Sequence, residues 1–315
     1  MIKCSAGTAK VLGFKELKTD AQPTTAYLMT GERCSHDCSF CPQAKNSSSR
    51  ADLLSRVTWP GFHREEVIER VAQSFVSKEL NRACLQVVDS KNALEETKQF
   101  LQDLHSRSAV PVCVSCAVGT LQAVGTLIAH GADHVSIALD AACERVFAEN
   151  KGGSWARKYN LLHQASQAFP GKIATHLIVG LGETEEEMLW TVQEMLDLGV
   201  TIALFAFTPV KGTRLEGAEP PALEHYRRIQ AARHLMLHGL SRFEQMLFVS
   251  GKLVDFGLAR ENWLEALAGG EAFRTSGCPD CNRPYYNEKP GGVMYNFPRP
   301  LTFEQSQQVL LELNI

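Results

Sequence analysis

The sequence feature that most constrains the fold is a regular alternation of two kinds of segment from residue 24 onward. Short apolar segments rich in β-formers alternate with longer amphipathic segments. The segments that we expect to be strands are 24–30, 83–88, 111–115, 134–139, 173–179, 201–207 and 245–250. The expected helices lie near 64–79, 92–106, 119–130, 155–168, 184–198, 222–238 and 256–268. Because the strands show little polar alternation, both of their faces should be buried, as in a parallel sheet wrapped by helices.

This repeat predicts an α/β fold, a TIM-type (βα) barrel, full or partial, with its active site at the carboxyl ends of the strands. We expect the barrel at 24–270, an N-terminal extension at 1–23 and a cysteine-containing tail at 271–315. The tail is rich in Gly, Pro, Asn and Tyr, so it should be irregular up to a helix near 303–313.

Composition narrows the classes of function. The chain has 315 residues, of which 44% are hydrophobic and 21% charged, as expected for a globular protein with a large core. A formal charge of -3 without a run of Lys and Arg argues against nucleic acid as a partner. We see no signal peptide and no segment able to cross a membrane, so we expect a cytoplasmic protein. Its ten cysteines should then be thiols or metal ligands rather than disulfides.

Three of these cysteines, Cys34, Cys38 and Cys41, fall in the stretch CSHDCSFC, directly after the first expected strand. Their spacing fits a helix face, but their neighbours are poor helix formers and Pro42 disfavours the α region at Cys41, so we expect a loop. Three thiols on one loop indicate a metal site. Cubane iron–sulfur clusters normally have four cysteine ligands, so three would leave one iron open to a small molecule. The alternative is a structural zinc whose fourth ligand is His36 or comes from the tail.

The arrangement Cys34-x3-Cys38-x2-Cys41, with the aromatic Phe40 and a preceding strand, resembles the signature of the radical SAM enzymes. In that family the open iron binds the amino and carboxylate groups of S-adenosylmethionine, and an electron from the cluster cleaves it to a 5′-deoxyadenosyl radical. The resemblance therefore implies a 4Fe–4S cluster bound with S-adenosylmethionine, and an electron donor such as ferredoxin or flavodoxin.

Within that family the chain resembles biotin synthase over most of residues 24–255. The matching stretches are FCPQ at 40–43, ALD at 138–140, IVGLGET at 178–184 and VKGT at 210–213. The resemblance implies that Asp140 holds the ribose hydroxyls, that Phe40 and Ile178 flank the adenine, and that Gly180 and Gly182 let the backbone approach the nucleoside. Without it, GLGETE would be a tight turn followed by a helix N-cap.

The chain also departs from biotin synthase, which holds a second cluster in the barrel with three strand cysteines and an arginine. Cys84 matches the first of these cysteines, and Cys113 or Cys116 lies near the second. The third position is Ala174, and the expected seventh strand has no arginine. A standard biotin synthase is therefore disfavoured. The alternative interpretation of Cys84, Cys113, Cys116 and Cys143 is that they are small buried hydrophobic residues.

The tail offers a replacement, because Cys278 and Cys281 form a metal-like Cys-x2-Cys, which Cys4 would join if the two chain ends meet at one mouth of the barrel. The alternatives are a zinc clip or reduced thiols without metal. The motif CPDCNRP, followed by YNFPRP, resembles the biotin synthase-like proteins that act as a two-component lipoyl synthase. This resemblance implies a second, auxiliary 4Fe–4S cluster, an octanoylated carrier protein as substrate and a paralogous radical SAM subunit as partner.

The resemblance implies a radical SAM enzyme that inserts sulfur into unactivated C–H bonds. In keeping with this, the sequence shows no Ser/His/Asp or paired-carboxylate signature. His176 should face the lumen, where a packed core histidine and a substrate contact are equally good interpretations. Arg283, Tyr285 and Tyr286 are candidates either for contacts with substrate or cluster or for packing. The alternative functions are a radical SAM isomerase or carbon-skeleton enzyme with zinc in the tail, and a non-catalytic metal-binding adaptor.

Overall fold

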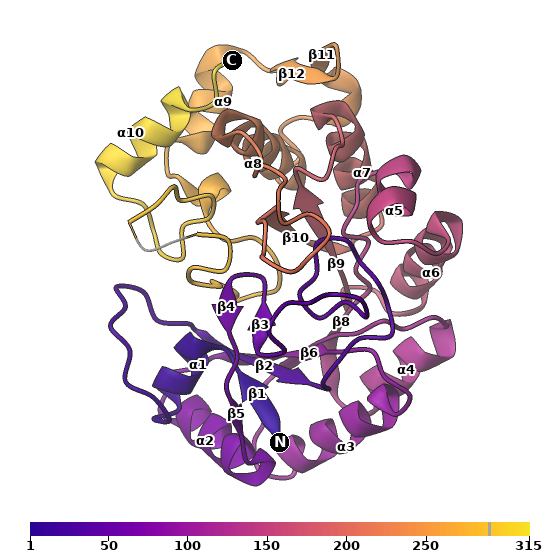
Figure 1. Cartoon of the computed structure of the whole chain (residues 1–315). Helices are drawn as coiled ribbons and strands as arrows, with labels where there is room; N and C mark the ends of the chain where they lie inside the picture. Colours follow the sequence, from indigo (N-terminus) through magenta and orange to yellow (C-terminus); the bar gives the residue numbers. More distant parts are fainter. Residues whose placement is uncertain (289–290) are drawn as a thin grey trace.

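The computed structural model describes residues 1–288 and 291–315, and its centre is an arc of parallel strands wrapped by helices (Figure 1). The strand order is β10-β9-β8-β7-β6-β2-β1-β5. The parallel strands are β2 (Thr25–Thr30), β6 (Arg82–Val87), β7 (Val112–Ser115), β8 (Ala132–Ser136), β9 (Ile173–Val179) and β10 (Thr201–Ala206). The predicted α/β fold of the TIM type is confirmed, in the form of a partial barrel.

The helices follow the predicted alternation, with two unpredicted additions at Ala6–Val11 and Glu144–Asn150. Their bounds are α1 (Ala6–Val11), α2 (Arg64–Val76), α3 (Ala93–His105), α4 (Leu121–Ala129), α5 (Glu144–Asn150), α6 (Trp155–Ala168), α7 (Glu185–Asp197), α8 (Leu223–Leu237), α9 (Arg260–Leu267) and α10 (Phe303–Leu311). Several begin at a side-chain cap: Ser154, Thr184 and Thr302 each accept a backbone N–H from the first turn. The short α5 between β8 and α6 was not predicted. None of the described helices is long and apolar enough to span a bilayer.

The prediction of a seventh barrel strand at 245–250 is wrong, because this segment does not join the main sheet. The segment does contain a strand, β11 (Leu247–Val249), but it pairs antiparallel with β12 (Lys252–Asp255) in a separate two-stranded ribbon. Leu247 and Val249 are largely exposed there. The segment is too short and too exposed to behave as a buried parallel strand, so the parallel part of the sheet ends at β10.

The N-terminal extension adds strands at the other end of the sheet. Strand β1 (Ile2–Cys4) pairs antiparallel with β2 and with β5 (Gly61–Phe62). A small ribbon, β3 (Leu53–Leu54) and β4 (Val57–Thr58), follows the cysteine loop. An antiparallel strand next to β2 means that further parallel strands do not continue the barrel on this side.

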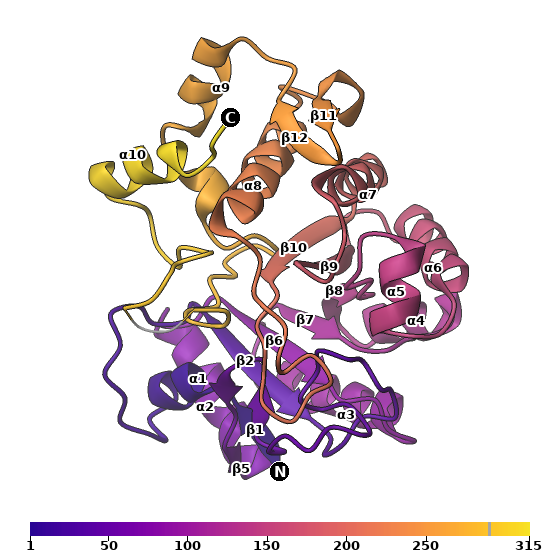
Figure 2. The same ribbon diagram turned by 45° about the horizontal axis from the view of Figure 1, so that its top comes forward.

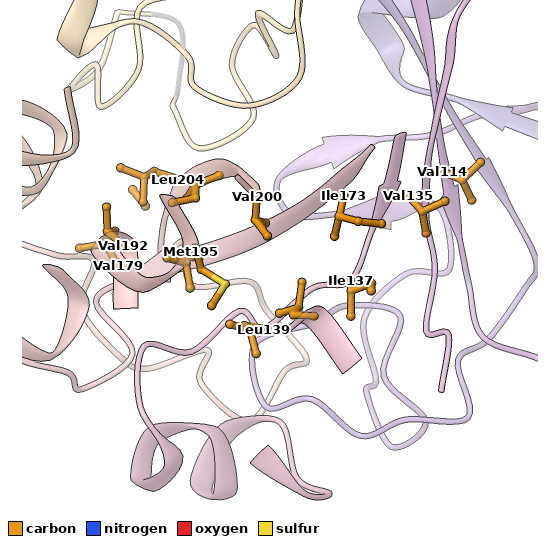
Figure 3. Close-up of a cluster of buried hydrophobic side chains, with 14 of the residues drawn as sticks. Val114, Val135, Ile137, Leu139, Ile173, Val179, Val192, Met195, Val200 and Leu204 are labelled. Carbon is orange, nitrogen blue, oxygen red and sulfur yellow. The ribbon is translucent and has the colours of Figure 1, made fainter. Parts of the chain in front are cut away.

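The main hydrophobic core lies between the sheet and its helices. Figure 3 shows side chains of this layer, with Val114, Val135 and Ile173 from adjacent strands beside one another. Because side chains alternate across a strand, the intervening residues face the lumen. Tyr27 and Cys84, which lie next to the buried Leu28 and Leu85, line the lumen. Strand alternation thus separates a dry core from a hollow with polar groups and thiols.

The tail closes the open side of the partial barrel. In Figures 1 and 2 the irregular segment before α10 lies between the β10 end of the sheet and the β1–β2 end. On one side the hydroxyl of Thr25 donates to the carbonyl of Asp280 at 3.0 Å. On the other side Asn287 Nδ2 donates to the carbonyl of Ala206 on β10 at 2.8 Å. Hydrogen bonds to the backbone of β10 therefore replace a further strand at this edge.

Candidate metal centres in the barrel lumen

The three cysteines of the motif lie on an irregular loop directly after β2, as predicted. The loop folds back on itself, because the N–H of Cys34 donates to the carbonyl of Gln43 at 3.0 Å and that of Cys41 to Cys38 at 3.2 Å. All three thiols line one cavity of about 710 Å³, which we call the loop cavity. The structure thus brings Cys34, Cys38 and Cys41 together at the carboxyl end of the first parallel strand.

The thiols of this loop lie farther apart than the ligands of a single zinc ion would. Two sulfur ligands of one tetrahedral zinc lie about 3.8 Å apart, given a Zn–S bond of about 2.3 Å. The sulfur atoms of Cys34, Cys38 and Cys41 do not all fall within 4.8 Å of one another; among the described residues, only a different trio does. His36, the alternative zinc ligand, has its Nε2 3.4 Å from a carboxylate oxygen of Asp89.

Burial favours the protonated form of two of the loop thiols, those of Cys38 and Cys41, in the metal-free chain. It raises the pKa of Cys38 to about 11 and that of Cys41 to about 12. A metal centre needs thiolates, so binding must release these protons.

The loop is fixed to the barrel by hydrogen bonds at its centre. The backbone N–H of Ser39 donates to the carbonyl of Asn150 at 2.7 Å, and its hydroxyl donates to the Asn150 side chain at 2.7 Å. Asn150 Nδ2 in turn donates to the carbonyl of Leu181 at 3.2 Å. This network joins the cysteine loop to α5 and to the glycine turn after β9.

Three of the residues predicted to bind the nucleoside lie around the same space. Phe40 and Asp140 line both the loop cavity and a neighbouring cavity in the lumen, and Ile178 lines the latter. Asp140 has a φ of 64° and its carboxylate accepts from Lys151 Nζ at 2.6 Å. Its role with ribose stays a prediction, and a ligand hydroxyl there would have to share the carboxylate with Lys151.

The two predicted glycines occupy a different place. Gly180 and Gly182 have φ values of 100° and 112° and line neither cavity. A Cβ at Gly180 would come within 2.9 Å of Pro221, and its N–H donates to Glu183 Oε1 at 2.6 Å. Together with the Thr184 capping box at the start of α7, this geometry supports the interpretation of a tight turn before a helix.

A second group of thiols lines the cavity inside the barrel, which has a volume of about 170 Å³ and which we call the lumen cavity. Its members, the lumen thiols, are Cys84, Cys113, Cys278 and Cys281. Cys84 on β6 lies directly opposite Cys113 on β7, and the tail supplies the other two. The same cavity is also lined by Cys41 and Asp140, so it connects the two groups of cysteines.

Polar donors surround the lumen thiols. Arg82 Nη1 donates to Cys113 Sγ at 3.2 Å, and Gln86 Nε2 donates to Cys84 Sγ at 3.1 Å. Tyr27 Oη lies 3.5 Å from Cys281 Sγ. A hydrogen bond from Cys113, aided by nearby positive charge, lowers the pKa of Cys278 although burial opposes it. In the metal-free chain burial raises the pKa of Cys84, and the hydrogen bond with Cys278 together with burial raises the pKa of Cys113. The donors from Arg82 and Gln86 would favour an anionic sulfur once a metal replaces these protons.

Arg283 indicates that the lumen is built for a negative charge. Its guanidinium is buried, donates to the carbonyls of Leu204 and Ser276, and lies over the Phe205 ring at 4.1 Å. Among the described residues no ion pair joins it to a carboxylate, and its Nη1 lies 3.6 Å from Cys281 Sγ. Because an unpaired buried charge costs several kcal/mol, an anionic group in contact with these thiols is the expected compensation. The residues therefore fit an iron–sulfur cluster.

The structure contradicts the prediction of Cys4 as a further ligand. Cys4 on β1 pairs with Leu28, and both belong to the core on the helix side of the sheet. Tyr27, one residue earlier, faces the lumen. The alternation of the strand therefore turns Cys4 away from the tail cysteines. Burial raises its pKa to about 12, as expected for a thiol in the core.

Sequence reasoning left Cys84 and Cys113 open between metal ligands and buried hydrophobic residues, and it missed His134 and Arg82. His134 lies opposite Cys113 in the β7–β8 register, and Arg82 contacts the same thiol. His134 and Arg82 could have been identified only from the register of the strands, which no local sequence pattern reveals.

Comparison with known proteins gives a family match over more than half of the chain. The model of the Radical SAM superfamily matches residues 28–195. A lipoyl synthase of Chlamydia caviae is 24% identical over 234 residues, which are 69% of this chain and 70% of that protein. A biotin synthase of Clostridium acetobutylicum is 23% identical over 194 residues, 59% of this chain and 57% of that protein.

Solved structures show the same fold. A methylornithine synthase superposes with a TM-score of 0.56 at 14% identity, covering 74% of this chain and 66% of that one. An FeFe-hydrogenase maturase from Carboxydothermus hydrogenoformans gives 0.54 at 14% identity, covering 69% and 52%. The match to the maturase spans about half of that protein's length.

Proposed function

The chain belongs to the radical SAM superfamily, and from that premise we propose that it inserts sulfur into unactivated C–H bonds as a component of a lipoyl synthase. The proposed substrate is an octanoyl chain carried on a protein. The distant lipoyl synthase and biotin synthase relatives support sulfur insertion as the class of reaction.

The observation that carries the proposal is the lumen cavity, which has Cys41 and Asp140 among its lining residues together with all four lumen thiols. A substrate carbon inside it would lie between the two groups. Its wall also contains apolar side chains, including Leu54, Phe205 and Phe207. An alkyl chain fits such a lining, and the same lining excludes water from reactive species.

We assign separate roles to three groups of residues in the chain. Cys34, Cys38 and Cys41 would hold the first 4Fe–4S cluster, while Phe40, Asp140 and Ile178 would orient the nucleoside. When bound, this cluster and S-adenosylmethionine would supply the radical chemistry that removes hydrogen from an unactivated carbon. The lumen thiols would hold a second cluster, which would be consumed as the sulfur-donating substrate. Arg82 and Arg283 would balance its negative charge.

The proposed reaction requires an electron donor, a protein that carries the substrate and a source of the second insertion. A reductant such as ferredoxin or flavodoxin would supply the electron, and the octanoylated carrier would present the chain to the lumen. Because a lipoyl group contains two sulfur atoms, we propose that a paralogous radical SAM subunit supplies one insertion and this chain the other.

Anaerobic reconstitution followed by counting of iron, sulfide and zinc tests the second cluster. The wild type should hold about eight irons, and the Cys278→Ala/Cys281→Ala variant about four. The matched control is Cys4→Ala/Cys143→Ala, which removes two cysteines that do not line the lumen cavity and should keep about eight. Equal iron in the wild type and the tail variant would refute the assignment.

A second candidate has one observation in its favour. The donor atoms of Cys113, His134 and Cys278 lie within 4.8 Å of one another, a spacing that also suits a single zinc. A radical SAM isomerase with a structural zinc would then show about four irons and about one zinc. Incubation with the octanoylated carrier and the paralogous subunit separates the two. If this chain inserts sulfur, the acyl group gains two sulfur atoms, whereas with an isomerase in its place the paralogous subunit adds at most one. A non-catalytic adaptor would not cleave S-adenosylmethionine at all.

A further inference from the structure

We propose that His134 is a metal ligand of the lumen centre, binding through Nε2 beside Cys113 and Cys278, and that Asp133 orients it. This inference rests on the proposed function in one respect, which is that the centre is taken to be the auxiliary cluster.

Three potential metal-ligating atoms converge at one place in the lumen. The donor atoms of Cys113, His134 and Cys278 lie within 4.8 Å of one another, and no other trio of His, Cys, Asp or Glu residues in the described part of the chain does so. Three separate elements, β7, β8 and the tail, bring these atoms together. A chance packing of surface groups is a poor explanation, because Cys113 is buried and the His134 side chain is only 13% exposed.

The strand register explains why His134 faces the thiols. Cys84 on β6 lies opposite Cys113 on β7, which lies opposite His134 on β8. Residues paired in register point to the same side of a sheet. The three residues therefore form one row across adjacent strands, and Cys278 of the tail approaches that row.

The imidazole of His134 is also oriented for metal binding. His134 Nδ1 lies 2.9 Å from Asp133 Oδ2, so the hydrogen bond assigns the proton to Nδ1 and leaves the lone pair on Nε2. A carboxylate behind a histidine is the usual support of a metal-bound imidazole. The same Asp133 oxygen accepts from Arg82, which also donates to Cys113 Sγ at 3.2 Å. One hydrogen-bond network therefore fixes the histidine and a neighbouring thiol.

With His134, five protein donors surround a centre that has at most four iron corners to bind. Loss of one donor need not empty such a site. Iron content alone is therefore a weak test, and the experiment needs a signal specific to the iron–nitrogen bond.

The test uses the full chain carrying Cys34→Ala, Cys38→Ala and Cys41→Ala, so that any reconstituted cluster belongs to the lumen. The protein is labelled with ¹⁵N-histidine, reconstituted, reduced and measured by pulsed EPR. We expect a histidine nitrogen coupling that disappears in His134→Gln. The coupling should persist in His176→Gln, which alters a histidine that lines the lumen cavity but lies outside the trio of Cys113, His134 and Cys278. Absence of coupling, or its survival in His134→Gln, would overturn the inference.

The two proposals fail in distinguishable ways. If a lumen cluster forms but shows no nitrogen coupling, His134 is not a ligand, and the proposal of sulfur insertion is unaffected. If no cluster forms in the chain that carries the three loop substitutions but still has His134, the proposed function is refuted. Titration of that chain with Zn²⁺ then tests whether His134 is a metal ligand. A bound zinc that is lost in His134→Gln but kept in His176→Gln supports the ligand, and equal zinc in both overturns it.

The supporting role of Asp133 has its own readout. Asp133→Asn keeps the shape of the side chain but removes its charge, and should weaken zinc binding by about 10- to 100-fold. Circular dichroism of the metal-free variants shows whether the fold is intact. An unchanged affinity in a folded Asp133→Asn variant would contradict the positioning role.

Discussion

At the scale of single residues, burial decides what His176 is able to do. Its side chain lines both cavities and packs against the Phe205 ring, with centroids 5.3 Å apart. Burial lowers its pKa to about 4, although Asp140 partly opposes this shift. The imidazole is therefore neutral near pH 7 and would face a ligand as a hydrogen-bonding group rather than as a cation.

This state of His176 is measurable by NMR on metal-free protein labelled at histidine. We expect its resonance, identified by its loss in His176→Gln, to stay unchanged from pH 8 down to about 5. The folded pKa lies below the unfolded value, so the unfolded chain binds the proton first as the pH falls. The contribution to stability is therefore complete above about pH 6.5 and declines toward pH 4. A titration midpoint near 6.5 would contradict the burial argument.

At the scale of elements, one buried ion pair ties the helices α7 and α8 to the ribbon of β11 and β12. Glu185 begins α7, and both of its oxygens accept from Arg228 Nε on α8, at 3.1 and 3.0 Å. One oxygen also accepts from the N–H of Leu253 on β12 at 2.8 Å. Both side chains are 3% exposed.

We predict that Glu185→Gln lowers the free energy of unfolding by about 3–5 kcal/mol, because the change leaves Arg228 charged and buried without its partner. The measurement is urea denaturation of the metal-free chain. Asp197→Asn serves as the matched control, since Asp197 also lies on α7 and pairs with Arg242, but both groups are about half exposed. Solvent screens that pair, so the control should lose much less. Equal losses in the two variants would be inconsistent with the burial argument.

At the scale of the whole molecule, the partial barrel and its tail enclose one space between two groups of cysteines. Ala174 on β9 lines the lumen cavity. The position matters because the cavity, at about 170 Å³, leaves little spare room. A bulky side chain at position 174 would occupy the part of the lumen cavity that we propose for the substrate chain.

We therefore expect Ala174→Phe to keep cleavage of S-adenosylmethionine but to lower sulfur insertion by more than about tenfold, because a small displacement of the reacting groups is costly. Ala174→Ser, which keeps the lumen open, is the control. The ratio of 5′-deoxyadenosine to thiolated acyl product measures the uncoupling. An unchanged ratio in Ala174→Phe would show that the substrate does not pass this point.

The sequence by itself determined the features that depend on neighbours along the chain. The alternation of β and α segments predicted the barrel, and the positions of six of its strands, because periodicity is a local signal. The three cysteines of the loop were recognisable for the same reason, since Cys34, Cys38 and Cys41 lie within eight residues. The capping box at Thr184 was equally local and is present in the structure.

Only the tertiary structure decided which distant residues share the lumen. The pairing of β7 with β8 places His134 beside Cys113, and docking of the tail adds Cys278. The same strand alternation that directs Tyr27 to the lumen directs Cys4 to the core, so a plausible ligand by composition is excluded by geometry. The physical reason is that a one-residue change in register moves a side chain to the other face of a sheet, and long-range pairing, not local pattern, fixes that register.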